Sequence, residues 1–362
     1  MSKGLYIHVP FCKTICFYCD FCHVGYNQSS CDDWLSALAK QLEQTKIEDI
    51  DTIYIGGGTP NCLDHAQLDR LLTLLDPYVS SVKEYTMEIN AEAMDEIKYK
   101  LFKKHGINRV SIGLQTTDHN FLRLLNRKAT FEDVKQCIEK FIKHGIDNIS
   151  VDLMYSLPFQ HLEDLAKDLD LIVALPIKHV SIYALTIEEN TFLGKQGFIN
   201  PDEEIEADMY LLAIDKLHAS GFKQYEVSNF AKEGYESQHN LHYWYFDDFY
   251  GLGPGASGKI DHVLYDNTKD IRKYINDPFL HEATPFKDKE EEMFEHIMMN
   301  LRLVKGIDSQ NFKQCYGVDL FIHYEKIIDE LIRKNLLIKE GLYLRCTKEG
   351  FPLLNTILTY FL

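Results

Sequence analysis

Short runs of alternating polarity recur along the first half of the chain. They lie at residues 5–9, 52–57, 85–90, 109–115, 148–154 and 179–186. Longer stretches with a helical pattern separate them, at about residues 31–45, 64–76, 95–105, 131–144 and 161–174. The short runs predict strands and the longer stretches predict helices. Six strands joined by helical crossovers predict an α/β fold with a parallel sheet.

These strands do not read as continuous apolar runs. In residues 109–115 every second residue is apolar, and residues 5–9 and 150–154 follow much the same pattern. Parallel strands covered on both faces are apolar throughout, so we expect one face to pack on helices and the other to line a polar interior. A barrel or partial barrel provides such an interior, whereas an open sheet with one wet face is the alternative. The side chains predicted to point inward are Tyr6, His8, Glu88, Arg109, Ser111, Gln115 and Asp152.

The pattern changes beyond about residue 285. Residues 290–303 and 321–334 predict two amphipathic helices, and residues 337–344 predict a hairpin that turns at Glu340 and Gly341. Helices followed by a hairpin suggest a winged-helix-like module. We therefore divide the chain into three parts. They are a partial-barrel domain at 1–230, a linker segment at 231–285 and a C-terminal helical, winged-helix-like domain at 286–362.

Composition and charge narrow the range of possible binding partners. Hydrophobic residues make up 45% of the 362 residues and charged residues 26%, which is typical of a globular protein. The formal net charge is -17 and no basic run is present, so we expect no nucleic-acid partner even for a winged-helix-like module. The sequence has neither a run of about eighteen apolar residues nor a secretory signal. It predicts a cytoplasmic protein without an integral membrane segment.

A group of cysteines follows the first predicted strand. Cys12, Cys16 and Cys19 have the spacing Cys-x3-Cys-x2-Cys and come directly after Pro10. Three thiolates can bind three irons of a 4Fe–4S cluster and leave the fourth iron open to another ligand. The alternative is a structural zinc site with Cys22 as the fourth ligand, although a second, separate Cys-x2-Cys knuckle is missing.

Residues 6–12 and 17–21, which surround these cysteines, resemble the opening of the radical S-adenosylmethionine (radical SAM) superfamily, in its coproporphyrinogen III oxidase-like branch. The resemblance implies a (β/α)6 partial barrel. It also implies a 4Fe–4S cluster on Cys12, Cys16 and Cys19, with S-adenosylmethionine as a second cofactor. Tyr18, just before the third cysteine, is then expected to lie against the adenosine.

Further residues match the cofactor-binding positions of this superfamily. The glycines of residues 55–60 let the backbone approach a ligand closely, and their exposed amides could take up a polar group. The resemblance assigns this turn to the amino group of S-adenosylmethionine. The resemblance also matches Glu88 to an acid at the end of a strand, and Gln115 with Arg127 to a polar pair further along the chain. The guanidinium of Arg127 suits a ligand carboxylate. The expected cofactor-binding residues in this set are Tyr6, Gly57, Gly58, Thr59, Glu88, Gln115, Arg127 and Asp152. Taken one at a time, the charged residues of this set could equally well be ordinary solvent-exposed residues.

A second motif lies at His239, in the sequence His-Asn-x-x-Tyr-Trp, where x is any residue, and a glycine-rich segment follows it at 251–257. By their chemistry these residues could offer an axial ligand and flat surfaces to a porphyrin, or form an ordinary packed aromatic loop. The motif is similar to that of HemW-type heme chaperones. The resemblance implies heme bound near His239, an unidentified heme-acceptor protein, and an electron donor such as flavodoxin or ferredoxin.

The alternative function is that of an oxygen-independent coproporphyrinogen III oxidase, which decarboxylates propionate side chains by radical chemistry. Those enzymes typically carry a cysteine two places after the third cluster ligand and a long extension ahead of the cluster. Here Phe21 holds that place and eleven residues precede Cys12, so we expect the chaperone. Two positions depart from the pattern. Ser156 replaces a glycine, and Cys22 is left as a spare thiol, a fourth cluster ligand or a redox partner.

Overall fold

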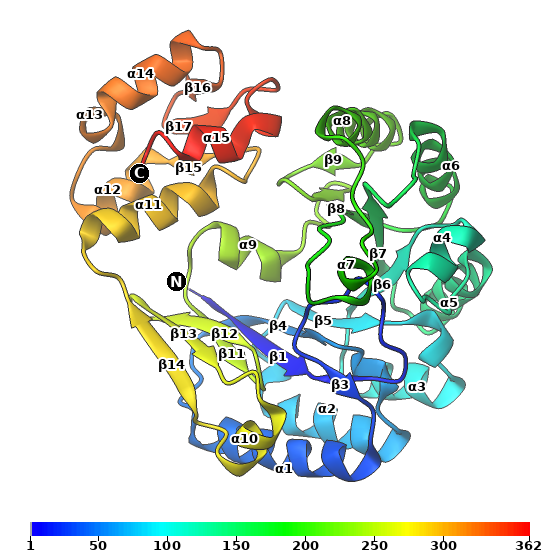
Figure 1. Cartoon of the computed structure of the whole chain (residues 1–362). Coiled ribbons are helices and arrows are strands. Elements are labelled where there is room, and N and C mark those ends of the chain that lie inside the picture. The colour runs from blue at the N-terminus through cyan, green and yellow to red at the C-terminus, as the bar shows by residue number, and fades with distance from the viewer. Residues whose placement is uncertain (1) are drawn as a thin grey trace.

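The centre of the molecule is a curved sheet of twelve strands, in the order β14-β13-β12-β11-β1-β4-β5-β6-β7-β8-β10-β9 (Figure 1). This computed structural model describes residues 2–362. Six neighbouring strands of the sheet run parallel. They are β1 (Lys3–Val9), β4 (Ile50–Gly57), β5 (Glu84–Ile89), β6 (Arg109–Gln115), β7 (Asn148–Tyr155) and β8 (His179–Ala184). The six predicted strands are confirmed, and the last one ends at Ala184.

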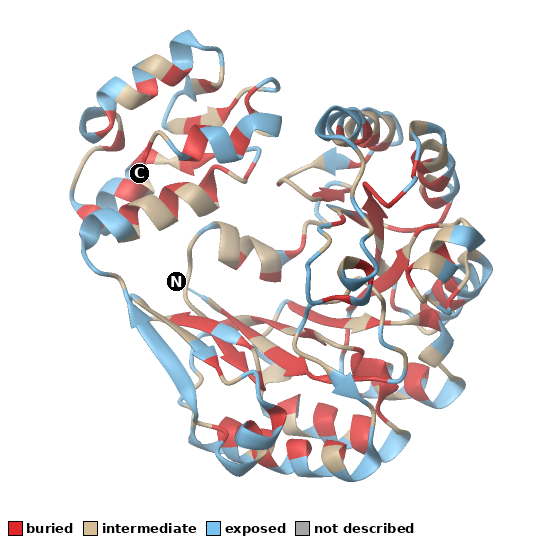
Figure 2. Ribbon diagram, viewed as in Figure 1, coloured by how far each residue is buried: buried red, intermediate tan, exposed pale blue. Residues whose placement is uncertain are grey.

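Helices cover the outer face of these strands. They are α1 (Gln28–Gln44), α2 (His65–Val79), α3 (Glu96–Lys104), α5 (Phe131–Lys143), α6 (Leu162–Val173) and α8 (Glu203–Ala219). The short helices α4 (His119–Leu124) and α7 (Phe192–Lys195) pack instead with Phe17 and Tyr18 of the cysteine loop. Each of the five predicted helices is present. The side chains of Leu5, Ile7 and Val9 on β1 are fully buried under them, and the ring of Trp34 on α1 meets that of Phe11 edge-on at 5.8 Å. Figure 2 shows these buried inner faces and the exposed outer faces of the helices.

The inner face of the sheet is polar, as the alternating pattern predicts. Arg109 and Ser111 on β6 are almost completely buried there, and Glu88 and Asp152 face the same interior from β5 and β7. These side chains line an internal cavity, so the sheet forms the predicted partial barrel and not an open sheet with one wet face. The polar face therefore serves a binding site.

Residues 231–285, predicted as a linker, add strands to one edge of the sheet. The strand β11 (Phe249–Leu252) pairs parallel with β1, and three antiparallel strands continue from it. The remaining elements here and at the opposite edge are β9 (Lys223–Gln224), β10 (Asn229–Ala231), α9 (Gln238–Trp244), β12 (Ser257–Ile260), β13 (Val263–Asn267), α10 (Ile271–Asn276) and β14 (His281–Pro285). The proposed boundaries at 230 and 285 stay a prediction.

The C-terminal part has a hydrophobic core of its own. Its elements are α11 (Lys289–Asn300), β15 (Ile307–Asp308), α12 (Ser309–Tyr316), α13 (Leu320–His323), α14 (Glu325–Arg333), β16 (Leu337–Glu340), β17 (Tyr343–Cys346) and α15 (Leu354–Leu358). The predicted hairpin is β16 and β17, joined through Gly341 at φ 59°, and β15 pairs with β17. The helix predicted at 321–334 is divided in two at Tyr324. Helices with a three-stranded sheet match the expected C-terminal region.

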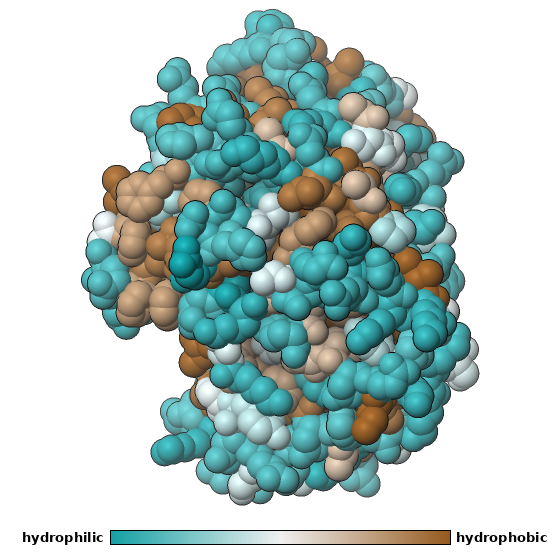
Figure 3. All heavy atoms as spheres, turned by 90° about the vertical axis from the view of Figure 1, so that its right-hand side faces the viewer, coloured by the Kyte–Doolittle hydropathy of each residue, from teal (hydrophilic) through white to brown (hydrophobic). Residues whose placement is uncertain are grey.

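Figure 3 shows that the face formed by the right-hand side of Figure 1 is mostly hydrophilic, with separate small hydrophobic patches. Across residues 2–362, no helix combines the length and apolar character needed to cross a membrane.

Candidate cofactor sites

A cavity of about 450 Å³ opens at the carboxyl ends of the parallel strands. It gathers residues from the cysteine loop, the glycine turn and the five strands β4 to β8, which are far apart in the sequence. The predicted site residues that line it are Cys12, Cys16, Tyr18, Cys19, Gly57, Gly58, Thr59, Glu88, Gln115, Arg127 and Asp152. Tyr6 and His239 are the two predicted residues that lie elsewhere. We call this space the first cavity.

The three predicted cluster ligands share one wall of the first cavity. The short strand β2 (Phe11–Cys12) pairs with β3 (Val24–Gly25), which closes the loop that carries Cys16 and Cys19. The Thr59 hydroxyl donates to Cys12 Sγ at 3.5 Å, and Arg127 Nη1 lies 3.7 Å from Cys16 Sγ. Burial raises the pKa of the Cys12 thiol, and it raises that of Cys19 to about 12. A bound metal is what would deprotonate such thiols.

A cluster and a single ion require different placements of the thiols. In residues 2–362, no three His, Cys, Asp or Glu side chains converge as the ligands of a single ion would. The tetrahedral zinc site considered above needs four such ligands within about 2.3 Å of one ion. Three cysteines on a 4Fe–4S cluster each bind a different iron, so they need not converge on one point. Hydrogen-bond donors also already face two of the sulfurs.

The glycine turn lets the backbone pass close to its neighbours. A Cβ on Gly58 would lie 2.8 Å from the Phe11 carbonyl and 3.0 Å from Cys12 Sγ, and Gly57 has φ +110°. The prediction of exposed amides is wrong, however. The amide of Gly57 donates to Glu88, that of Gly58 to the Val9 carbonyl and that of Thr59 to the Phe11 carbonyl. Because these three amides already have acceptors, the turn can offer a ligand its carbonyl oxygens and the space that its missing side chains leave.

Two carboxyl groups face the first cavity from the strands. Glu88 accepts from the Tyr54 hydroxyl at 2.8 Å, and burial raises its pKa to about 7. Asp152 accepts from the Ser111 hydroxyl at 2.9 Å, and burial raises its pKa too. Sequence reasoning missed Tyr54, although its place in the alternating run at 52–57 was a usable signal. A buried carboxyl group with a raised pKa can form hydrogen bonds with the hydroxyl groups or the ammonium group of a ligand.

The predicted polar pair lies at the end of β6. The strand has an irregularity between Gly113 and Gln115, where Gln115 takes φ 76°. Arg127 donates to Asn90 Oδ1 at 2.9 Å and to the Gly113 carbonyl, while its Nε is buried without a partner. A guanidinium with an unused N–H at the cavity wall suits a ligand carboxylate.

Ser156 takes the place of a glycine in the family pattern, and the structure shows why glycine suits it. Its φ is 60°, a conformation in which side chains are unfavourable. The serine hydroxyl donates to a Glu206 carboxylate oxygen at 2.5 Å, which gives the strained residue a partner.

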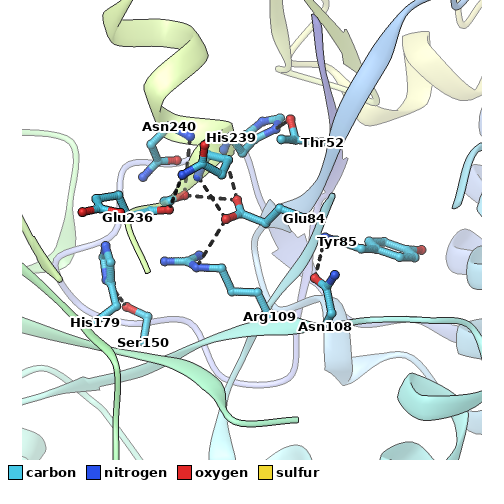
Figure 4. A network of polar contacts seen from close by, with 12 residues as sticks. Thr52, Glu84, Tyr85, Asn108, Arg109, Ser150, His179, Glu236, His239 and Asn240 are labelled. Carbon is cyan, nitrogen blue, oxygen red and sulfur yellow. Dashed lines mark hydrogen bonds and ion pairs between the residues drawn. The ribbon is translucent and has the colours of Figure 1, made fainter. Parts of the chain in front are cut away.

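His239 lies in a buried network of polar contacts (Figure 4). It lines neither the first cavity nor a second cavity that is described next. Its Nδ1 is 2.8 Å from the Thr52 hydroxyl and its Nε2 is 2.7 Å from the Tyr243 hydroxyl. Burial holds its pKa well below the usual range. The Glu84 carboxylate accepts from the amide of His239, and Arg109 lies 3.9 Å from the same carboxylate. In this structure the imidazole supports α9 and has no free ring nitrogen.

A second cavity of about 690 Å³ adjoins the first. The cavities share Asp20, Phe21, Gly57 and Glu88 in their linings. Its other aromatic or potential iron-binding residues are Tyr6, His8, Cys22, Tyr243, Trp244, Phe246, Phe249 and Met299. Ligand pockets in proteins span roughly 300–1,000 Å³, so both cavities fall in that range. Tyr6 is therefore separated from most of the predicted cofactor residues.

Comparisons with known proteins agree with this arrangement. The Radical SAM superfamily matches residues 6–172, and the HemN C-terminal domain matches residues 288–353. A solved structure of Escherichia coli coproporphyrinogen III oxidase (HemN), described as a radical SAM enzyme, superposes with a TM-score of 0.86 at 21% identity. It covers 99% of this chain and 90% of that one. The fold and the cysteine loop thus define a member of the radical SAM superfamily.

Curated relatives identify the family within it. The heme chaperone HemW of Lactococcus lactis is 34% identical, over 99% of this chain and 97% of its own length. The Bacillus subtilis protein of the same name is also 34% identical, with 99% coverage of both chains. The Escherichia coli one is 32% identical, over 99% of this chain and 98% of its own. This chain belongs to the HemW family.

Proposed function

We propose that this protein is a heme chaperone that binds a 4Fe–4S cluster, S-adenosylmethionine and heme, and transfers heme to an acceptor protein. The observation that carries the proposal is the pair of adjoining cavities with different linings. The first has three thiols, carboxyl groups and an arginine, as a cluster with a charged cofactor requires. The second has aromatic faces suited to a porphyrin. HemW relatives named heme chaperones support the same function.

In the first cavity, Cys12, Cys16 and Cys19 would hold the cluster. Arg127 suits the carboxylate of S-adenosylmethionine, Glu88 and Asp152 suit its hydroxyl or ammonium groups, and Tyr18 suits its adenine face. When bound, this cofactor pair supplies one-electron chemistry at the sulfonium group. The protein residues orient the ligand and exclude water. The turn at Gly57 to Thr59 and the end of β6 at Gln115 complete the wall.

Heme is assigned to the second cavity, beside α9. The helix presents Tyr243 and Trp244 to this space, and Tyr6 lies in the wall formed by β1. His239 remains a candidate heme ligand. Its Nε2 would have to exchange the bond to the Tyr243 hydroxyl for iron. The acceptor protein, an electron donor such as flavodoxin or ferredoxin, and a cytoplasmic location belong to the same proposal.

The alternative, coproporphyrinogen III oxidase activity, is favoured by the shared fold with HemN. The two functions differ in what happens to the porphyrin side chains. We expect anaerobically reconstituted protein to shift the Soret band of added hemin, and to release no decarboxylated product from coproporphyrinogen III. Formation of that product would establish the oxidase instead.

Cluster binding is tested on the same preparation by iron and sulfide analysis. Cys16→Ala removes a proposed ligand, so we expect most iron and sulfide to be lost. Cys315→Ala removes an exposed thiol of the C-terminal part and should leave both unchanged. One zinc per chain without sulfide would refute the cluster.

A further inference from the structure

Cys22 is a thiol that the proposed function does not use. It stands three residues after Cys19, yet it lines the second cavity, whereas Cys12, Cys16 and Cys19 line the first. The two residues between them, Asp20 and Phe21, line both cavities and lie on the wall between them. The chain therefore turns so that the fourth cysteine of the loop points away from the other three.

We propose that Cys22 is the residue that binds the heme iron, as a thiolate ligand, when heme occupies the second cavity. This inference rests on the proposed heme-chaperone function and adds the iron ligand to it.

The histidine and tyrosine side chains that could bind iron in place of Cys22 already form hydrogen bonds. The His8 ring lines the cavity, but its Nε2–H donates to the Cys22 carbonyl at 2.8 Å and its Nδ1 accepts from the Tyr6 hydroxyl at 3.1 Å. The Tyr243 hydroxyl is bonded to His239. Both imidazoles thus hold neighbouring groups in place, and His8 fixes the backbone of Cys22 itself.

The Cys22 sulfur forms a weaker hydrogen bond than these groups do. Its Sγ–H donates to the Lys269 carbonyl at 3.2 Å, and the side chain is only partly buried. A thiol is a weak donor, so the loss of this bond costs little. Among the imidazole, phenol and thiol groups of this wall, Cys22 is the one that iron can bind with the least rearrangement.

The backbone opposite Cys22 makes room for it. Gly255 has φ +74°, and a Cβ built there would lie 2.6 Å from Cys22 Cβ and 3.0 Å from its Sγ. Only a glycine allows this approach, because a side chain would meet both the strained backbone and the cysteine. The glycine-rich segment at 251–257 thus acquires a specific role in shaping the second cavity.

One cation of the remaining lining is free to meet an acidic side chain of a porphyrin. Phe249 adds an aromatic ring to the wall, and Lys259 and Lys269 add ammonium groups beside the carboxyl groups of Asp20, Glu88, Asp247 and Glu295. Lys259 is bonded to Asp248 at 2.9 Å. Lys269 has no carboxylate within ion-pair distance among residues 2–362, so its ammonium group is available to a heme propionate.

The coordination step balances without a redox partner. Ferric iron exchanges a weakly bound water for Cys22 sulfur, the thiol releases one proton to solvent, and iron keeps its oxidation state. Metal coordination deprotonates a thiol that burial otherwise keeps protonated. Thiolate is an established axial ligand of heme iron and has its own spectroscopic signature.

The test compares hemin-loaded proteins by Soret absorption, by electron paramagnetic resonance of the ferric state and by hemin titration. For Cys22→Ser we expect the thiolate signature to disappear and hemin affinity to fall by about tenfold or more. Iron and sulfide content should be unchanged, since Cys22 lies apart from the cluster ligands. Cys315→Ser is the matched control and should behave as the wild type.

A ligand replacement separates coordination from a structural role. Cys22→His should restore hemin affinity with a histidine-type spectrum, which a residue that only shapes the fold would not do. A Cys22→Ser protein with the wild-type spectrum and affinity would overturn the inference, as would loss of iron and sulfide in that variant. If His239→Ala then abolishes the Soret shift, the chaperone function stands with His239 as the ligand. If the wild type itself binds no hemin, the proposed function fails.

Discussion

At the scale of single residues, His242 shows how α9 is tied to the barrel. Its Nε2 lies 2.7 Å from Asp51 at the start of β4, and its Nδ1 lies 3.0 Å from Asp247. Burial opposes a charge on the imidazole, but hydrogen bonds with Asp247 and Asp51 outweigh it and raise its pKa. The protonated ring can donate to both carboxylates at once.

This pKa shift predicts a pH-dependent contribution to stability. Because the folded-state pKa is raised, the contribution is fully present below about pH 6.5, the ordinary histidine value, and is lost as pH rises through the folded pKa. His242→Gln should therefore lower the free energy of unfolding by roughly 1.5–3 kcal/mol at pH 5.5, and by less at pH 8.5. Urea denaturation at both pH values measures it.

The matched control is His262→Gln. That imidazole also faces a carboxylate, Glu292 at 2.5 Å, but its side chain is 73% exposed. Water screens such a pair, so we expect little change at either pH. An equal loss at both pH values for His242→Gln would show that shape and not charge is what His242 contributes.

At the scale of elements, the short helix α9 depends on its neighbours. Seven residues are too few for a helix that is stable alone. The Glu84 carboxylate, at the start of β5, accepts hydrogen bonds from the backbone amides of Gln238 and His239 at 2.9 and 3.0 Å. The Arg109 guanidinium on β6 lies 3.9 Å from the same carboxylate (Figure 4). A charged acceptor at a helix N-terminus satisfies its free amides and complements its dipole.

Glu84→Ala should be severely destabilising. The substitution leaves the buried Arg109 guanidinium without its carboxylate and two helix amides without an acceptor. Loss of one partner of a buried pair costs about 3–5 kcal/mol. Glu84→Gln keeps an acceptor and should cost less. Thermal and urea unfolding give the values.

The control for this element is Glu96→Ala on α3, whose side chain is 60% exposed beside His144. We expect a change near zero there. Should Glu84→Ala cost no more than Glu96→Ala, the network in Figure 4 would not be what holds α9 on the barrel.

At the scale of the whole molecule, the second cavity joins the barrel strands β4 and β5, through Gly57 and Glu88, with three other distant parts of the chain. His8 and Cys22 come from the N-terminus, Phe249 and Lys269 from the added strands and loops, and Met299 from α11. A ligand that fills this space would contact these parts together. It should therefore bind the folded state only, since the cavity does not exist in the unfolded chain.

Hemin should raise the unfolding temperature of the protein. At a concentration about a hundredfold above its Kd, a ligand specific to the folded state adds about 2.7 kcal/mol to the free energy of unfolding. Differential scanning calorimetry measures the shift, and hydrogen exchange should show slower exchange in α11. Iron-free protoporphyrin IX should stabilise less, because it lacks the bond to Cys22. Equal stabilisation by both porphyrins would argue against an iron ligand in the cavity.

Local patterns in the sequence determine the barrel strands and their helices. The alternation at 109–115 predicts β6 with Arg109 and Ser111 inward, because side chains on a strand alternate between faces wherever it pairs. The hairpin near Gly341 follows from local turn chemistry in the same way. The spacing of Cys12, Cys16 and Cys19, together with the residues around it, predicts the superfamily.

Only the tertiary structure decides what each side chain meets. His239 and Thr52 are bonded across 187 positions of sequence, which places the histidine out of both cavities. Cys22 differs from Cys19 only by three positions, yet a turn of the loop sends it into the second cavity. Hydrogen-bond partners and cavity walls are set by elements that meet in space, and no local period records which ones will meet.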